Sequence, residues 1–367
     1  MNPRVAIVHD YLVDSGGAER VVIALHEQFP DAPIFTSVID RQTTFPVFNL
    51  MDVRTSFLQR LPVRKSNYKL LLPFFPVAFE SFDLSDYDVV VSSASGFAKG
   101  VVTSSDTLHV CYCHTPSRFA WRFHEYVAQE QMGRVKRSIV QLIVHFLRQW
   151  DYVAAQRVDY FIANSQTTAQ RIQKNYRRES VVIHPPIDVE SFSICGDIGD
   201  YYLVVSRLAP YKRIDLVVQA FNELALPLKI VGAGVDAQRL RALAKPNVEF
   251  LGHVPQNQLS ELYARSRAVI FPGVEDFGLV PLEANAAGRP VIAFAAGGAL
   301  ETIIDGVTGR FFNESTSDAL MAAVRETDIH SFDAGAMRAH AERFSKTQFQ
   351  KQIADFIGEK WQSFGPP

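Results

Sequence analysis

The sequence of 367 residues contains few cysteines and almost no net charge. Its three cysteines are an odd number without the spacing of a disulfide framework, which favours a reducing compartment. Cys111 and Cys113 lie two residues apart in an apolar run, so they indicate one face of a strand rather than a zinc site. A formal net charge of −2 gives the whole chain no electrostatic bias toward nucleic acid. We expect a cytoplasmic protein that does not bind nucleic acid.

Features that would target the chain to a membrane, or anchor it there, are also missing from the sequence. No charged leader or cleavage site precedes the strand-like residues 5–8, so no signal peptide is expected. The longest apolar stretch, residues 139–150, is interrupted by Gln141, His145 and Arg148. It is shorter than the roughly 20 residues that a transmembrane helix needs, and we expect no membrane-spanning segment.

Length and composition fit a folded protein with two domains. Hydrophobic residues make up 47% of the chain and charged residues 21%, which are typical proportions for a folded globular protein. The chain is also longer than one ordinary domain. Short β-branched runs alternate with helical patterns, which indicates parallel sheets covered by helices. The strand-like runs are residues 5–8, 89–92, 108–112, 160–163, 201–205, 228–231, 248–251, 268–271 and 290–293.

We therefore predict an α/β protein with two Rossmann-like parallel-sheet domains that face a central cleft. The first domain is assigned to residues 1–190 and the second to residues 191–345. Their join is expected near residues 185–199, where prolines and glycines interrupt both patterns. The last helical pattern, within residues 346–367, is too long to complete the second domain, and we expect it to cross back to the first.

Two glutamates eight residues apart form the strongest chemical signal. Glu275 and Glu283 lie between a strand-like run that ends at Phe271 and a helical pattern that begins near Leu279. Ligands of open α/β sheets bind at the carboxyl edge of the strands, where carboxylates can accept hydrogen bonds from sugar and ribose hydroxyls. Taken singly, each glutamate is more simply explained as a solvated surface acid.

A basic loop follows the first strand of the second domain. Arg207 and Lys212 lie five residues apart in this loop. Fixed positive charge at a strand end can neutralise a diphosphate as a sugar–phosphate bond breaks, in place of a divalent metal. The alternative is a solvated basic turn.

Glycine-rich loops and one histidine give weaker signals. Gly16 and Gly17 follow the first strand and open a helix, as in phosphate-binding loops, but without the full dinucleotide fingerprint. The Gly232-Ala233-Gly234 segment is more typical of an ordinary strand-to-helix turn. His114 follows a strand, at a position that would face a cleft, but a lone histidine is as often structural.

Together these motifs resemble the retaining family-4 glycosyltransferases of GT-B fold. The glutamate pair with its FGLVPLEA core, the SRLAPYKRID loop, the GGALETIIDGVTGRFF tail and the N-terminal GGAER loop follow the order of that family, over nearly the whole chain. Four segments are most similar in sequence to bacterial mannosyltransferases that build O-antigen and other exopolysaccharides: HDYLVDSGGAER, CYCHTPSRFAW, DYFIANS and HPPIDVESF. The resemblance implies transfer of mannose from GDP-mannose onto a glycan or lipid-linked acceptor, in the synthesis of cell-surface polysaccharide such as lipopolysaccharide.

The resemblance also implies roles for the candidate residues of the second domain. Arg207 and Lys212 would hold the donor diphosphate, Glu283 the ribose hydroxyls and Glu275 the transferred sugar. Three further residues would hold that sugar through their backbone: Phe277, Gly278 and Leu279. No divalent metal or other cofactor is implied, because the two cations take the place of a metal.

In the first domain, His114 would contact the sugar, Gly16 and Gly17 would lie under the phosphates, and Asp10 and Arg118 would contact the acceptor. The implied catalytic set is His114, Arg207, Lys212 and Glu275. Enzymes with this arrangement are thought to retain configuration by front-face attack, with the leaving phosphate taking the acceptor's proton. No general base is therefore assigned.

A basic region belongs to the same domain and consists of Arg118, Arg122, Arg134, Lys136, Arg137 and Arg148. With an acceptor linked to polyprenyl diphosphate, this region would favour peripheral contact with the cytoplasmic face of the inner membrane. A helix with a solvated basic face is the alternative.

Other functions remain open on sequence grounds, because one fold supports several chemistries. The donor could be another nucleotide sugar such as UDP-glucose. A nucleotide-sugar epimerase would need no acceptor, a glycan phosphorylase would need a pyridoxal-bearing lysine that no motif indicates, and a non-catalytic protein would only bind sugar.

Overall fold

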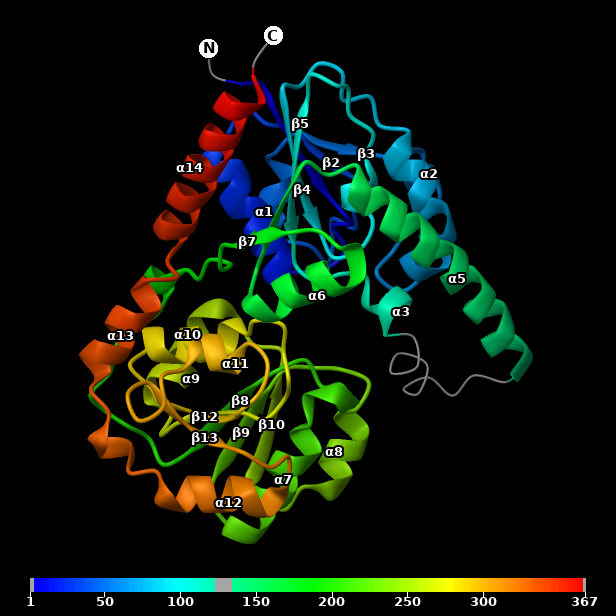
Figure 1. Cartoon of the computed structure of the whole chain (residues 1–367). Coiled ribbons are helices and arrows are strands. Elements are labelled where there is room, and N and C mark those ends of the chain that lie inside the picture. The colour runs from blue at the N-terminus through cyan, green and yellow to red at the C-terminus, as the bar shows by residue number, and fades with distance from the viewer. Residues whose placement is uncertain (1–2, 123–133, 366–367) are drawn as a thin grey trace. The chain divides into compact units, whose positions relative to one another are not determined.

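The computed structural model describes residues 3–122 and 134–365. It confirms an α/β protein with two parallel-sheet units (Figure 1). Unit 1 comprises residues 1–186 and 349–367, and unit 2 comprises residues 187–348. Each unit has its own hydrophobic core on both faces of its sheet.

The sheet of unit 1 is parallel throughout, with the strand order β3-β2-β1-β4-β5-β6-β7. Its strands are β1 (Val5–His9), β2 (Ile34–Thr36), β3 (Val53–Thr55), β4 (Val89–Ala94), β5 (Leu108–Cys113), β6 (Tyr160–Ala163) and β7 (Ser180–Val182). In the central strand β1, Ile7 pairs with Ile34 on one side and with Val91 on the other. The central strands are buried on both faces, which explains their continuous apolar runs.

Helices cover both faces of this sheet. The helices of unit 1 are α1 (Gly17–Gln28), α2 (Phe75–Glu80), α3 (Arg118–Trp121), α5 (Arg134–Gln156), α6 (Gln166–Tyr176) and α14 (Lys346–Phe364). On one face, α1 contributes Val21 and Leu25 to the core. On the other face, α2 contributes Phe75 and Phe79, and α6 contributes Ile172 and Tyr176.

The last helix, α14, belongs to unit 1, as the sequence pattern predicted. Its buried residues Phe349, Ile353 and Ile357 join the core that β1 and α1 form. Figure 1 shows α14 beside α1, and the Gln350 amide donates a 3.1 Å hydrogen bond to the Ala24 carbonyl. The chain therefore passes from unit 1 to unit 2 and returns.

The sheet of unit 2 is also parallel, with the order β10-β9-β8-β11-β12-β13. Its strands are β8 (Tyr202–Val205), β9 (Leu228–Val231), β10 (Val248–Gly252), β11 (Val269–Phe271), β12 (Val291–Phe294) and β13 (Gly309–Phe312). Its helices are α7 (Ile214–Leu224), α8 (Ala237–Leu243), α9 (Gln256–Arg265), α10 (Leu279–Ala286), α11 (Ala299–Thr302), α12 (Ser317–Glu326) and α13 (Ala334–Glu342). Residues of α7, α8 and α12 form the core on one face, and residues of α9, α10, α11 and α13 form the core on the other.

Four strands were not among those expected from the sequence: β2, β3, β7 and β13. The first three have only three residues each, too few for a periodic pattern to emerge. Cys111 and Cys113 both lie buried on β5, as their spacing predicted. Among the helices of the described residues, none combines the length and the hydropathy needed to cross a bilayer.

Candidate donor and acceptor sites

The candidate residues of unit 2 gather at one point of its sheet. Strand β8 has β9 on one side and β11 on the other, so the chain reverses its direction of winding between β8 and β11. Open α/β sheets bind ligands at such a switch point, beyond the carboxyl ends of the strands. The loop after β8 carries Arg207 and Lys212, and the loop after β11 carries Glu275.

An ion pair joins these two loops. The Lys212 ammonium donates a hydrogen bond to the Glu275 carboxylate, and their side chains are only 11% and 24% exposed. The Arg207 guanidinium donates to the Tyr211 hydroxyl, and Lys212 also lies 5.2 Å from the centre of the Tyr211 ring. Glu275 is therefore not a solvated loop acid, and Lys212 is not part of a freely solvated turn, whereas Arg207 is exposed.

Two glycine segments allow the loops to pack backbone against backbone. A Cβ atom on Gly234 would lie 2.1 Å from the Leu208 carbonyl oxygen, and a Cβ on Gly298 would lie 2.0 Å from the Phe277 carbonyl oxygen. Both distances are too short for any side chain. The absence of a side chain at Gly234 therefore lets its backbone pack against the basic loop. Gly298 packs in the same way against the loop that carries Glu275, and the Gly298 N–H donates a 2.9 Å hydrogen bond to the backbone carbonyl of Glu275.

Glu283 lies on α10 and is only 5% exposed. The Tyr263 hydroxyl of α9 donates a 2.8 Å hydrogen bond to its carboxylate. The interpretation of Glu283 as a surface residue of a helix is therefore wrong. A carboxylate has two oxygens and about four acceptor positions, so Glu283 can accept a hydrogen bond from Tyr263 and also one from a ligand hydroxyl.

The other predicted sugar contacts lie at the start of α10. Phe277 is buried, Gly278 adopts a φ of 91°, and Leu279 is the first residue of the helix. The N-cap residue of this helix, Gly278, has no side chain with which to cap the first backbone N–H groups, and such groups can bind polar atoms beyond a helix end.

The switch point of unit 1 lies between β1 and β4, and three of its candidate residues follow β1: Asp10, Gly16 and Gly17. Asp10 directly follows β1 and is only 2% exposed. Its carboxylate accepts hydrogen bonds of 2.6 to 2.7 Å from the backbone N–H groups of Ser95, Phe97 and Ala98, in the loop after β4. Asp10 thus fixes the loop beside it, and a contact with an acceptor stays a prediction.

His114, directly after β5, takes part in a buried polar chain. Its Nε2 atom lies 2.8 Å from the Ser93 hydroxyl, which lies 3.2 Å from Nδ1 of His9. Burial lowers the pKa of His9 below its ordinary value, although the neighbouring Asp10 opposes this shift. The ring of His114 is therefore held by β1 and β4, and it is 9% exposed.

Gly16 and Gly17 form the start of α1, where the sequence placed a phosphate-binding loop. The Gly16 N–H donates a 3.0 Å hydrogen bond to the carboxylate of Glu19, which is only 5% exposed. Burial raises the pKa of Glu19 to about 7, against the opposing effect of hydrogen bonds from the Glu19 and Gly16 backbone. The sequence analysis did not single out Glu19, although its position three residues after the helix cap is a capping signal.

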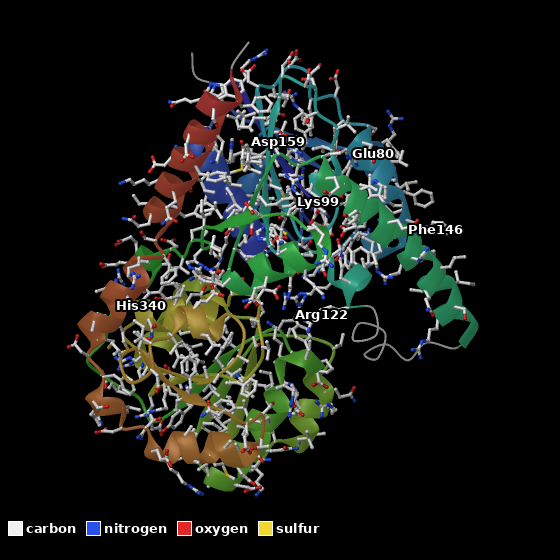
Figure 2. All side chains as sticks on the ribbon, viewed as in Figure 1. Glu80, Lys99, Arg122, Phe146, Asp159 and His340 are labelled. Carbon is white, nitrogen blue, oxygen red and sulfur yellow. The ribbon has the colours of Figure 1, made fainter. Side chains whose placement is uncertain are left out.

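A buried ion pair supports the segment that follows His114. The Lys99 ammonium, labelled in Figure 2, donates to the Asp151 carboxylate of α5, and both side chains are almost fully buried. Asp151 also accepts hydrogen bonds of 2.7 to 2.8 Å from Ser117, Trp121 and Tyr176. Neither residue was among the sequence candidates, because these five side chains come together only in the folded unit.

Arg118 is exposed at the first position of α3. Arg122 and Arg137 are also exposed, and Arg148 donates a 2.7 Å hydrogen bond from Nε to the Ala120 carbonyl. The side chains of Arg134 and Lys136 lie outside the described ones.

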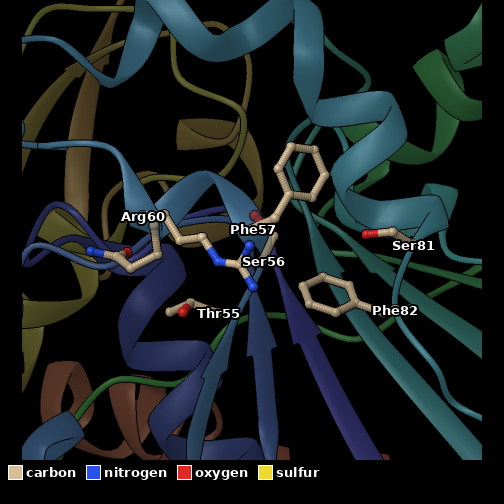
Figure 3. Close-up of a pocket in the computed structure, with 7 residues that line it drawn as sticks. Thr55, Ser56, Phe57, Arg60, Ser81 and Phe82 are labelled. Carbon is tan, nitrogen blue, oxygen red and sulfur yellow. The ribbon is translucent and has the colours of Figure 1, made fainter.

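A separate pocket of about 480 Å³ lies beyond the edge strand β3 (Figure 3). Its lining comes from the end of β3, the segment that follows β3 and the segment after α2: Thr55, Ser56, Phe57, Gln59, Arg60, Ser81 and Phe82. None of these residues was predicted to bind donor or acceptor. As for metals, residues 3–122 and 134–365 hold no cluster of three or more His, Cys, Asp or Glu side chains that could bind an ion.

Comparison with known proteins defines the class. The crystal structure of Anabaena Alr3699/HepE in complex with UDP and glucose has the same fold, with a TM-score of 0.72, 19% sequence identity and coverage of 97% of this chain and 100% of that chain. Residues 15–191 match the family model "Glycosyltransferase Family 4", and residues 199–327 match "Glycosyl transferases group 1". The chain is thus a glycosyltransferase of GT-B architecture.

Two curated mannosyltransferases are similar to it. The GDP-mannose-dependent alpha-(1-6)-phosphatidylinositol monomannoside mannosyltransferase of Mycolicibacterium smegmatis is 29% identical over 218 residues, which cover 51% of this chain and 57% of that protein. The alpha-1,3/1,6-mannosyltransferase alg2 of Schizosaccharomyces pombe is 24% identical, over 98% of this chain and 80% of that protein. The match thus spans little more than half the length of the first relative.

Proposed function

We propose that this protein is a retaining mannosyltransferase that transfers mannose from GDP-mannose to a glycan or a polyprenyl-diphosphate-linked acceptor in the synthesis of cell-surface polysaccharide. The observation that carries the proposal is the meeting of Lys212 and Glu275 at the switch point of unit 2, with Arg207 in the same loop. The printed activity of the Mycolicibacterium relative supports the choice of GDP-mannose.

The ion pair suggests how the donor site changes when the substrate binds. A diphosphate carries more negative charge than one carboxylate, so it competes with Glu275 for the Lys212 ammonium. Once Lys212 turns to the diphosphate, Glu275 can accept hydrogen bonds from the hydroxyls of the transferred sugar. The same event thus neutralises the leaving group and completes the sugar site.

The remaining residues take roles that fit their positions. Glu283, already fixed by Tyr263, would accept hydrogen bonds from the ribose hydroxyls, and the start of α10 would present backbone N–H groups to the sugar. From unit 1, His114 would contact the sugar, Gly16 and Gly17 the phosphates, and Asp10 and Arg118 the acceptor. The leaving phosphate would take the acceptor's proton, so no side chain is assigned as general base.

Donor selectivity tests the proposed sugar. GDP-mannose and GDP should raise the thermal unfolding midpoint, and UDP-glucose and UDP should raise it less, because a ligand at 100 times its Kd stabilises by about 2.7 kcal/mol. Misplaced hydroxyls that leave buried groups unpaired cost roughly 1–3 kcal/mol. A preference for the uridine pair would contradict the mannose donor and leave the transferase class in place.

The proposed absence of a metal is tested by turnover in excess EDTA. Arg207 and Lys212 provide fixed positive charge where a divalent ion would act, so transfer should continue at an unchanged rate. Activity that EDTA removes and magnesium or manganese restores would contradict the proposal. Incubation of the donor without acceptor separates the alternative function, because an epimerase would convert the sugar to an isomer.

A further inference from the structure

Three buried polar side chains of unit 1 form a hydrogen-bonded chain that ends at His114. They come from neighbouring strands: His9 ends β1, Ser93 lies one residue before the end of β4, and His114 directly follows β5. His9 and Ser93 are partners in the ladder between β1 and β4, and Ser93 is the partner of Tyr112 on β5. His114 lies two residues beyond Tyr112, so all three side chains belong to one face of the sheet.

The backbone carbonyl of Ser93 shows which nitrogen of His9 carries a proton. Nδ1 of His9 lies 3.0 Å from this carbonyl oxygen. A carbonyl oxygen only accepts hydrogen bonds, so Nδ1 must be an N–H group. Burial lowers the pKa of His9, which favours the neutral ring. The single ring proton of His9 is therefore on Nδ1.

The Ser93 hydroxyl lies between the two histidine rings. Its oxygen is 3.2 Å from Nδ1 of His9, so it accepts a share of the hydrogen bond that this N–H group donates to the Ser93 carbonyl. The hydroxyl is fully buried, and its own proton needs an acceptor. Among the described residues, the only other atom that hydrogen-bonds to this hydroxyl is Nε2 of His114, at 2.8 Å. Nε2 of His114 is therefore an acceptor.

The direction of this hydrogen bond determines the protonation state of His114. An imidazole whose Nε2 accepts a hydrogen bond carries its proton on Nδ1. A proton on Nε2, in the other neutral form or in the imidazolium, would give the Ser93 hydroxyl two N–H donors. The proton of that hydroxyl would then be buried without an acceptor, which is unfavourable.

We propose that Ser93 and His9 are positioning residues that hold His114 as a neutral imidazole with its proton on Nδ1, so that His114 donates a hydrogen bond to a hydroxyl of the transferred sugar. The inference deepens the proposed function and rests on it, because contact with the sugar is the role proposed there for His114. One ring nitrogen of His114 is bonded to Ser93 and the other carries a proton. His114 therefore does not act as a base, in agreement with transfer of the acceptor's proton to the leaving phosphate.

A similar pair on the opposite face of the same sheet provides a matched control. Ser92 directly precedes Ser93 on β4, and successive residues of a strand point to opposite faces. Ser92 is also fully buried, and its hydroxyl lies 2.9 Å from Nε2 of His109 on β5. Both serines therefore contact Nε2 of a buried histidine, but only Ser93 contacts His114.

Ring ¹⁵N spectra of protein with labelled histidine test the tautomer without any ligand. Protonated and unprotonated ring nitrogens resonate in separate ranges, and loss of signals in His114→Gln assigns those of His114. Above about pH 6.5, the ordinary pKa of histidine, His114 should show a protonated Nδ1 and an unprotonated Nε2. Ser93→Ala should move the proton at least partly to Nε2. Ser93→Thr, which keeps the hydroxyl, and Ser92→Ala should both retain the native pattern.

Titration calorimetry with GDP and GDP-mannose tests the effect on the sugar. Ser93→Ala should weaken binding of GDP-mannose about 2- to 10-fold, because a hydrogen bond of His114 to the sugar is weakened or lost. Binding of GDP, which has no transferred sugar, should not change. Ser92→Ala should leave the affinity for both ligands unchanged.

Four results would overturn the proposal. Two are spectroscopic: a protonated Nε2 of His114 in the native chain, and a native pattern that Ser93→Ala does not alter. The other two are equal weakening of GDP and GDP-mannose by Ser93→Ala, and the same effects from Ser92→Ala, because both would show a loss of packing instead of a lost hydrogen bond. The spectra need no donor, so the tautomer can be confirmed even if GDP-mannose is not the donor.

Discussion

Among single residues, Lys212 is the one whose loss should separate catalysis from folding. Its ammonium faces Glu275 across two loops and contributes little to the core. Lys212→Ala should lower turnover by about 100- to 1000-fold, because a charge-assisted contact with a transition state is worth roughly 2.7–4 kcal/mol. Steady-state kinetics and thermal unfolding of the same preparation measure the two effects separately.

Lys245 provides the matched control for this substitution. It is exposed and lies before β10, at the opposite edge of the sheet from the loops of the candidate site. Lys245→Ala should leave turnover unchanged. A Lys212→Ala variant that retains near-normal rates, or that no longer folds, would contradict the assignment.

Glu19 should make stability depend on pH near neutrality. Its pKa of about 7 in the folded chain lies above the roughly 4.3 of an unfolded glutamate. The folded chain therefore holds a proton that the unfolded chain releases. The resulting stabilisation is complete below about pH 4 and is lost as the pH rises through about 7.

The variant Glu19→Gln cannot release this proton. Relative to this variant, the native chain should lose stability as the pH rises from about 4 to about 7 and should lose little more above that. Unfolding midpoints of both proteins across that range measure the effect, and their difference cancels the contributions of other groups such as the buried His9. A difference that stays constant with pH would show that Glu19 does not titrate in this range.

The sequence predicted which residues belong to the candidate site, but it did not predict which of them contact one another. Arg207, Lys212 and Glu275 follow apolar runs that are recognisable as strands, so the sequence places them at the carboxyl edge of a sheet. Lys212 and Glu275 are 63 residues apart, and they meet only because β11 crosses to the far side of β8. No local pattern specifies that order.

At the scale of helices and strands, the buried pair Lys99 and Asp151 connects several elements of unit 1. Burial alone would lower the pKa of Lys99, but the Asp151 carboxylate outweighs this effect and raises it. Asp151→Ala would leave the Lys99 charge buried without its partner and free three hydrogen-bond donors. We expect a loss of about 3–5 kcal/mol in the free energy of unfolding, measured by denaturant titration.

The surface pair of Arg54 and Asp52 is the control for this prediction. Their side chains are 51% and 58% exposed, so Asp52→Ala should cost less than about 1 kcal/mol. If Asp151→Ala costs no more than Asp52→Ala, the buried network does not stabilise the unit. The network escaped sequence analysis because its members lie on four separate elements and follow no spacing rule.

At the scale of the whole molecule, the two parallel sheets and the return of the last helix followed from the sequence, because the alternation of strand and helix is strong and restarts once. The return predicts that α14 stabilises unit 1. Ile353 is fully buried there, so Ile353→Ala should cost about 2–5 kcal/mol. Hydrogen exchange should then accelerate in β1 and not in β8.

Lys351→Ala, two residues away and exposed, should leave both strands as protected as in the native chain. Faster exchange in β8 than in β1 after Ile353→Ala would contradict the assignment of α14 to unit 1.

The position of α14 also affects how the protein folds during translation. On the ribosome, β1 and α1 emerge first, but Phe349, Ile353 and Ile357, which complete their apolar layer, emerge only after residues 187–348 have been translated. At 5–20 residues per second this delay is roughly 10–30 s. For that time the nascent first unit exposes part of its core, which makes it a natural client for chaperones, while unit 2 can fold without waiting.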